Sequence, residues 1–163
     1  MGVSVFPAPS AASKTMFRTT LTSGTSYTVP AGVTYLNLLL VGGGGGAGGS
    51  SGPSSTIRAS VASATPGESI YSTLSVTAGA SIAYAIGAGG SGAGGGGDSG
   101  GAGGTTTFTG ATSALGGRGG VVASDGATGR ISFVTNEGKN SSTNGSNGGG
   151  SGGSGFIVIE YWA

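Results

Sequence analysis

The carboxylates are the only side chains in this sequence that could carry acid–base chemistry near neutral pH, and they are few. The 163 residues include no His and no Cys, which removes the usual general base, thiolate nucleophiles, disulfides and the common zinc ligands. The acidic residues are widely separated: Glu68, Asp98, Asp125, Glu137 and Glu160. A glycan-cleaving enzyme needs a pair of carboxylates, and loops could supply only Asp98 or Asp125 with Glu137. We therefore expect no enzyme, no catalytic residue, no metal site and no cofactor.

One glycine pattern imitates a nucleotide-binding motif. Gly43, Gly45 and Gly48 follow an apolar segment with the spacing of the dinucleotide fingerprint. That fingerprint requires a helix whose N-terminus faces the pyrophosphate, and the following residues 50–55 (SSGPSS) do not favour a helix start. The net charge of +1 also provides no basic surface for nucleic acid. The sequence therefore predicts neither nucleotide nor nucleic-acid binding.

Polar loop residues are the best candidates for contacts with a ligand. Asn, Ser and Thr side chains suit sugar hydroxyls, and glycine backbone offers N–H and C=O groups that a ligand can approach closely. The candidate receptor-binding residues are Asp98, Asp125, Asn136, Asn140, Asn144 and Asn147. Each of them, taken alone, is better explained as a solvated loop residue than as a contact residue.

Short apolar and β-branched segments must position these loops, and they predict an all-β domain. No segment has sustained helical periodicity, and Gly and Thr disfavour helices. The nearly continuous apolar run 33–41 predicts a strand buried on both faces. Strands are expected at 17–22, 33–41, 105–109, 130–134 and 156–162, and in segments ending near Val76 and Ile86. The strand aromatics are expected to be mostly core: Tyr27, Tyr35, Tyr71, Tyr84, Phe133, Phe156, Tyr161 and Trp162.

Glycine makes up 40 of the 163 residues and gathers in tracts that interrupt the predicted strands. Collagen is excluded because the every-third-residue register of Gly89, Gly92 and Gly95 breaks at Asp98. Flexible linkers remain an alternative. The favoured interpretation is a packed array of polyproline II-like polyglycine helices anchored by short strands, a glycine-rich sandwich. Such helices lack internal hydrogen bonds and must bond to close neighbours, which only glycine allows.

The array hypothesis predicts the effect of added methyl groups. An alanine at Gly44 or Gly95, central in their tracts, should destabilise the fold by about 1–3 kcal/mol. Gly148 in the polar loop should tolerate the same change. Flexible linkers would make all three substitutions neutral or slightly stabilising.

The chain divides into an N-terminal arm, residues 1–16, and one glycine-rich β domain, residues 17–163. Pro7 and Pro9 favour extended backbone in the arm, and its small residues offer little to bury. We expect no secretory signal at the start and no membrane span, because no apolar run approaches the roughly 20 residues that a span requires.

Ordered anchor phrases recur beyond the glycine bias. They are YTVPAGVT (27–34), VGGGGG (41–46), VTAGASIAYAIGAGG (76–90), the TTFTG and GGRGG phrases within 106–120, and GSGFIVIEYW (153–162). Together they make residues 17–162 resemble the glycine-rich domain of bacteriophage tail-fibre and fibre-tip adhesin proteins. The chain differs from the family pattern in two ways. Residues 50–75 are interpreted as a segment added between the first glycine tract and the Val76 strand. The chain is also short and has no shaft, which favours a separate subunit that attaches to a larger part of the virion.

The resemblance implies a virion structural or adhesin subunit that is made in the host cytoplasm and exposed on the virion surface. It implies packed polyglycine helices, loops that carry host recognition, and no enzyme activity. The expected partners are other virion proteins, reached through the arm, and a host-surface glycan or outer-membrane protein; a homo-oligomer such as a trimer is compatible with this role. The alternative is a capsid decoration, cement or head-fibre protein with a purely structural role.

Overall fold

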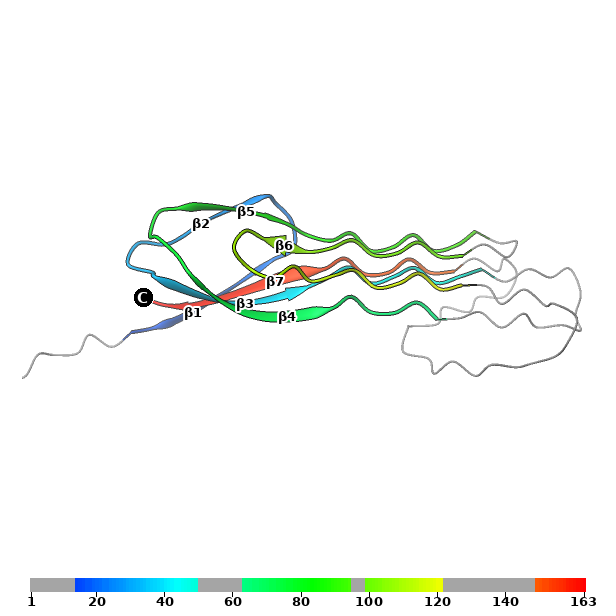
Figure 1. Cartoon of the computed structure of the whole chain (residues 1–163), viewed down its shortest axis with the longest axis horizontal. Helices are drawn as coiled ribbons and strands as arrows, with labels where there is room; N and C mark the ends of the chain where they lie inside the picture. Colours follow the sequence, from blue (N-terminus) through cyan, green and yellow to red (C-terminus); the bar gives the residue numbers. More distant parts are fainter. Residues whose placement is uncertain (1–13, 50–62, 95–98, 122–148) are drawn as a thin grey trace, which may run out of the picture.

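Two antiparallel β-sheets form one end of the molecule, and extended segments run from them to the other end (Figure 1). The computed structural model describes residues 14–49, 63–94, 99–121 and 149–163. The four-stranded sheet has the order β1-β7-β3-β4 and the three-stranded sheet the order β2-β5-β6. The strands are β1 (Met16–Leu21), β2 (Ser26–Thr28), β3 (Tyr35–Val41), β4 (Ser69–Ser75), β5 (Ser81–Ala85), β6 (Thr107–Phe108) and β7 (Phe156–Trp162). The all-β prediction is confirmed for these residues, which include no helix.

The central strand β3 is buried on one face only. Leu36, Leu38 and Leu40 are almost completely buried, whereas the residues between them are more exposed. The prediction that this strand is buried on both faces is wrong, because the second sheet covers one face of the four-stranded sheet and leaves the other open. The apolar run that suggested two buried faces includes Leu39 and Val41, which lie half-buried on the open face.

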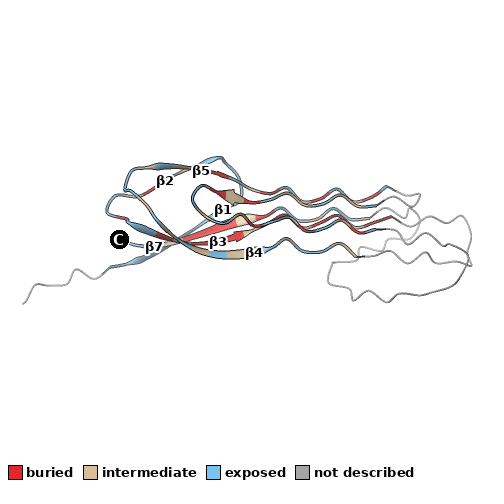
Figure 2. Ribbon diagram, in the orientation of Figure 1, coloured by how far each residue is buried: buried red, intermediate tan, exposed pale blue. Residues whose placement is uncertain are grey.

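The core fills the space between the two sheets (Figure 2). From the three-stranded sheet, Tyr84 of β5 and Phe108 of β6 stack with ring centroids 6.3 Å apart. The Tyr84 hydroxyl donates a 2.7 Å hydrogen bond to the carbonyl of Ser23, so its polar end is satisfied. The largest fully buried side chains are Phe108, Leu36, Leu38, Leu40, Ile157, Ile159, Val29, Val33 and Thr106.

Several predicted core aromatics lie at the surface. Tyr35 and Tyr71 are 60% and 81% exposed and project from the open face of the four-stranded sheet, and Trp162 at the end of β7 is 45% exposed. The core prediction is therefore wrong for these three and right for Tyr84. Burial raises the pKa of the half-buried Tyr27 phenol, and the nearby Tyr161 raises it further.

Among the described residues, the edge strand β1 pairs only with β7, and this explains its exposure. The alternation in 17–22 predicted a half-buried strand; the strand is present, but residues 16–20 are exposed. Phe17 stacks on Tyr161 with ring centroids 5.4 Å apart. Pairing already begins before the predicted domain boundary, since Met16 opposes Trp162 and the Thr15 N–H donates to the Ala163 carbonyl at 2.9 Å.

Residues 69–75 belong to the centre of the fold. They form β4, which pairs with β3 along its whole length, from Val41 opposite Ser69 to Tyr35 opposite Ser75. The interpretation of 50–75 as an added segment is thus wrong for this part, while 50–62 lies outside the described residues. The predicted strand 105–109 is shorter than expected, and the predicted strand 130–134 with Phe133 also falls outside the described part of the chain.

Candidate functional site at the tract end

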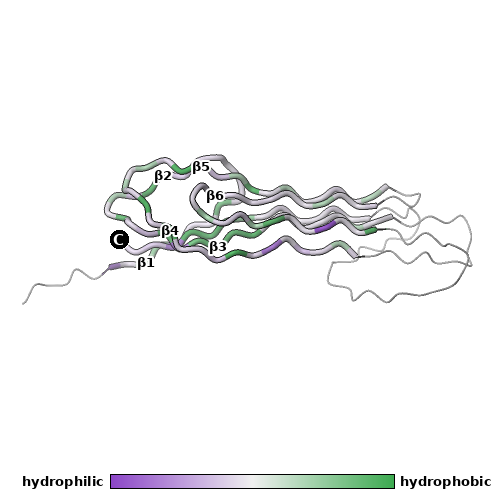
Figure 3. The backbone as a smooth tube through the Cα atoms, in the orientation of Figure 1, coloured by the Kyte–Doolittle hydropathy of each residue, from purple (hydrophilic) through white to green (hydrophobic). Residues whose placement is uncertain are grey.

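In the described residues, six extended tracts that are not β-strands run side by side from the sheets (Figure 1). Tracts 1, 3 and 5 follow β3, β5 and β6 and run away from the sheets, and tracts 2, 4 and 6 return to β4, β6 and β7. Tract 1 is 42–49, tract 2 is 63–68, tract 3 is 86–94, tract 4 is 99–105, tract 5 is 114–121 and tract 6 is 149–155. Figure 3 shows that their side chains are mostly of middling hydropathy, with the strongly apolar residues concentrated in the sheets. Backbone contacts must therefore dominate between the tracts.

Tract 1 lies at the centre of these contacts, and its successive N–H groups donate hydrogen bonds to three neighbouring tracts in a repeating order. Gly42, Gly43 and Gly44 donate to tracts 2, 4 and 6 in that order, at 2.8–2.9 Å. The next three residues, 45–47, repeat the order at 2.8–3.0 Å. The hydrogen bonds of tract 1 thus have a period of three residues rather than the two-residue period of a strand.

The carbonyl groups of tract 1 extend the same pattern. Those of Gly43 and Gly46 accept from tract 5, and those of Gly44 and Ala47 accept from tract 3. Tracts 3, 4 and 5 also bond to one another: tract 4 donates to tract 3 at 2.7–2.8 Å and to tract 5 at 2.8 Å. The tracts therefore form one hydrogen-bonded body.

Close approach makes glycine necessary at most positions of tract 1, but not at all of them. A Cβ on Gly45 would collide with the Arg118 carbonyl of tract 5, and a Cβ on Gly46 would collide with the Ser91 carbonyl of tract 3. A Cβ on Gly44 would have Gly153 N as its nearest atom at 3.6 Å, an ordinary contact. The choice of Gly44 as a position where alanine destabilises is therefore wrong; Gly95 and Gly148 lie outside the described residues.

Thr106 joins the sheets to the tracts, and sequence reasoning did not identify it. Its side chain is fully buried. The hydroxyl donates to the Val41 carbonyl at 2.7 Å and accepts from the Gly87 N–H at 3.0 Å. Val41 immediately precedes tract 1 and Gly87 is the second residue of tract 3, so one hydroxyl fixes the relative position of the starts of two tracts. The triplet of threonines at 105–107 gave no signal that only the middle one is buried.

The predicted receptor-binding residues lie outside the described residues, but the positions where their segments begin and end are defined. Asp98 belongs to 95–98, and Asp125, Asn136, Asn140, Asn144 and Asn147 belong to 122–148. Gly94, Ser99, Val121 and Gly149 flank these segments, and all four end tracts at the end of the molecule away from the sheets (Figure 1). Segment 50–62 also begins and ends there. We call this end the tract end.

The two described acidic residues have structural partners. A Glu68 carboxylate oxygen accepts from the Leu115 N–H at 3.1 Å, and Glu160 lies 3.5 Å from the Arg18 guanidinium. They belong to tract 2 and to β7. Within the ranges that the structure describes, no group of three or more His, Cys, Asp or Glu side chains could hold a metal ion.

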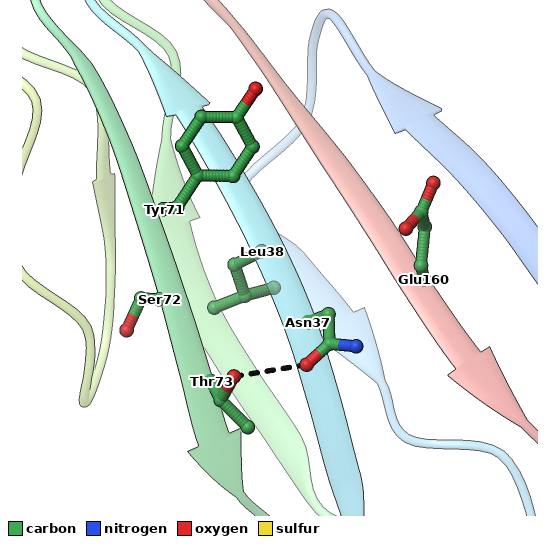
Figure 4. A pocket seen from close by; sticks show the side chains of 6 residues that line it. All are labelled: Asn37, Leu38, Tyr71, Ser72, Thr73 and Glu160. Atoms are coloured by element: carbon green, nitrogen blue, oxygen red, sulfur yellow. Dashed lines mark hydrogen bonds between the residues drawn. The ribbon is translucent and has the colours of Figure 1, made fainter.

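The open face of the four-stranded sheet carries a shallow depression of about 350 Å³ (Figure 4). Tyr71 of β4 and Glu160 of β7 lie on either side of β3, and between them the Thr73 hydroxyl donates to Asn37 Oδ1 at 3.0 Å. The lining residues are Asn37, Leu38, Tyr71, Ser72, Thr73 and Glu160. The depression presents one aromatic ring, one amide and one carboxylate, and sequence reasoning missed it because the strand was expected to be buried on both faces.

Comparison with known families gives a match over most of the chain. The model of a glycine-rich domain matches residues 19–156. The chain belongs to this glycine-rich domain family. The match includes every strand of the three-stranded sheet, strands β3 and β4, and all six tracts. It covers β1 and β7 of the four-stranded sheet only in part. A search of curated proteins found no match. In the described part of the chain, no helix is long and apolar enough to cross a membrane.

Proposed function

We propose that this chain is a non-catalytic structural and adhesin subunit of a bacteriophage virion, a tail-fibre or fibre-tip component that binds a receptor on the host surface. The observation that carries the proposal is the separation of the two ends. Two connecting segments with the predicted contact residues begin and end at the tract end. The N-terminal arm enters at the opposite end, where Thr15 bonds to Ala163. One end is thus available for attachment and the other for recognition.

The finer architecture in this proposal is a packed array of polyproline II-like helices. Four features support it: the three-residue hydrogen-bond period, the antiparallel and parallel neighbours of tract 1, the collisions that a Cβ would cause, and the glycine-rich family. A polyproline II helix has three residues per turn and no internal hydrogen bonds, so its N–H and C=O groups point to neighbours in several directions. A body held by such bonds would be a stiff support for short recognition segments.

The partners follow from this arrangement. The arm joins other virion proteins, and the segments at the tract end contact a host-surface glycan or outer-membrane protein. The protein would be exposed on the virion surface after synthesis in the host cytoplasm. The polar composition of 136–147, with four Asn among twelve residues (136, 140, 144 and 147), suits hydrogen bonding to sugar hydroxyls.

The experiment that tests the proposal locates the chain on particles and measures adsorption. Gold-labelled antibody against the purified protein should mark sparse sites at the tail, and the purified protein should compete with particles for adsorption to host cells. Regular labelling over the shell, with no competition, would replace the adhesin role with the capsid decoration or head-fibre role.

A further inference from the structure

Two carbonyl groups of tract 1 have no donor among the described residues. The hydrogen bonds given above use the N–H groups of 42–47 and the carbonyls of Gly43, Gly44, Gly46 and Ala47. They leave the carbonyls of Gly42 and Gly45, which are again three residues apart. Both glycines are buried, and an unpaired backbone carbonyl in such a position costs free energy.

These carbonyls face a gap in the ring of neighbours around tract 1. Hydrogen bonds join tract 2 to tract 5, tract 5 to tract 4, tract 4 to tract 3 and tract 3 to tract 6. Within the described residues no bond joins tract 6 back to tract 2, and Figure 1 shows tract 2 alone along the lower margin. We call the side of tract 1 between tracts 6 and 2 the open side. Gly44 also faces it, since it is half-buried and a Cβ there would have its nearest neighbour at 3.6 Å. Ala47 is half-buried on the same side and carries a Cβ, so the stretch that a close neighbour can approach lies beside residues 42–45.

Tracts 6 and 2 turn unused N–H groups toward the open side. In tract 6 the N–H groups of 149, 152 and 155 donate to tract 3. Gly150 and Gly153 are turned by a further third of a turn; neither N–H has an acceptor among the described residues, and a Cβ on either would meet nothing within 4 Å. In tract 2 the N–H groups of Ala64 and Gly67 are likewise unused, three residues apart.

Tracts 3 and 5 are already held in place by contacts of this same kind. Tract 3 accepts from tracts 4 and 6 and donates to tract 1, and tract 5 accepts from tracts 2 and 4 and donates to tract 1. The open side offers a third chain the matching contacts: donors from tracts 6 and 2, and acceptors on tract 1. Because tracts 3 and 5 run in the direction of tract 1, a chain that repeats their bonds must run that way too.

We propose that the open side binds an extended glycine-rich segment of another protein chain, running away from the sheets and completing the ring around tract 1. The proposal rests on the packed array described under the proposed function, but not on the adhesin role. It extends the interface that tracts 3 and 5 already make inside the molecule.

The required sequence can be derived from tracts 3 and 5. A Cβ on Gly89 would collide with the Gly152 carbonyl and one on Gly90 with the Gly101 carbonyl, whereas Ala88 and Ser91 point outward and are exposed. Tract 5 has the same repeat, with Arg118 outward. The bound segment therefore needs Gly-Gly-X repeats. Segments 1–13, 50–62 and 122–148 contain no Gly-Gly pair, and segment 95–98, which does, is only the four-residue connection between tracts 3 and 4. None of these segments has the required repeat, and the occupant proposed is therefore a segment of a different chain.

The direct test titrates the full, ¹⁵N-labelled protein with a capped peptide of four Gly-Gly-Ser repeats. Ordering a flexible glycine chain loses backbone entropy and weakens binding, so the titration must extend to millimolar peptide. We expect saturable downfield shifts at the amides of Gly67 and Gly153. A peptide of four Gly-Ala-Ser repeats, matched in length, should bind at least tenfold more weakly. Equal binding of both peptides, or shifts confined to other amides, would overturn the proposal.

A blocking variant locates the site. Gly44→Leu places a side chain on the open side, between the carbonyls of Gly42 and Gly45, and should abolish the peptide shifts, whereas Ser91→Leu on the outward side of tract 3 should leave them intact. Thermal unfolding confirms that each variant is folded; if Gly44→Leu is not, Gly44→Ala takes its place. Unchanged binding by the blocking variant contradicts the proposal. Self-association of the chain without peptide, lost in Gly44→Leu, would make the occupant a second copy instead. Failure of the adhesin role would appear only in adsorption, not in this titration.

Discussion

Neighbouring glycines in tract 1 have opposite requirements for space, and this provides the sharpest test of the packed array. Gly45→Ala would drive a methyl group into the Arg118 carbonyl, whereas the methyl group of Gly44→Ala has its nearest neighbour at 3.6 Å. We expect Gly45→Ala to lower the free energy of unfolding by about 1–3 kcal/mol. Gly44→Ala should be neutral or stabilising by about 0.5 kcal/mol, because it reduces the entropy of the unfolded chain. Denaturant unfolding of the two variants measures the difference in the free energy of unfolding. Equal stability of the two variants would contradict the packed array and favour the interpretation of the tracts as flexible linkers.

The hydroxyl of Thr106 should contribute more to stability than its methyl group. Thr106→Val keeps the shape but leaves the Val41 carbonyl and the Gly87 N–H without their partner, which should cost about 1–3 kcal/mol. The control Thr106→Ser keeps the hydroxyl and loses one buried methyl group, at a cost of about 0.8 kcal/mol. Thermal and denaturant unfolding should rank valine below serine. The opposite ranking would mean that the hydroxyl does not fix the two tracts.

At the scale of elements, the segment 136–147 should be replaceable. It belongs to the connection between Val121 and Gly149, whose flanking tracts are already bonded to tracts 1, 3 and 4. A short Gly/Ser link in its place should change the melting temperature little, since few core contacts should depend on a polar connection. Adsorption to host cells should fall if the segment carries recognition. A large loss of melting temperature would assign it a structural role.

At the scale of the whole molecule, removing the arm should separate folding from assembly. The deletion should stop at residue 13, because Thr15 and Met16 already pair with the end of β7. The truncated protein should melt at the temperature of the intact chain and be absent from particles, as measured by gel analysis of purified virions. A Gly/Ser arm of equal length is the control for length alone. Normal occupancy of the truncated protein would show that the anchor lies elsewhere.

The sequence by itself determined the all-β class, the position of most strands and the family, because alternation, apolar runs and glycine tracts are local features. β7 was expected at 156–162 and occupies Phe156–Trp162. The packed array and the receptor-binding residues remain predictions. Only the tertiary structure decided which face of β3 is open and that Thr106 is buried. It also decided that Gly45 lacks space for a methyl group while Gly44 has it. The physical reason is that each of these properties depends on atoms brought close from distant parts of the chain, such as the Arg118 carbonyl beside Gly45, and no pattern within one segment records its neighbours.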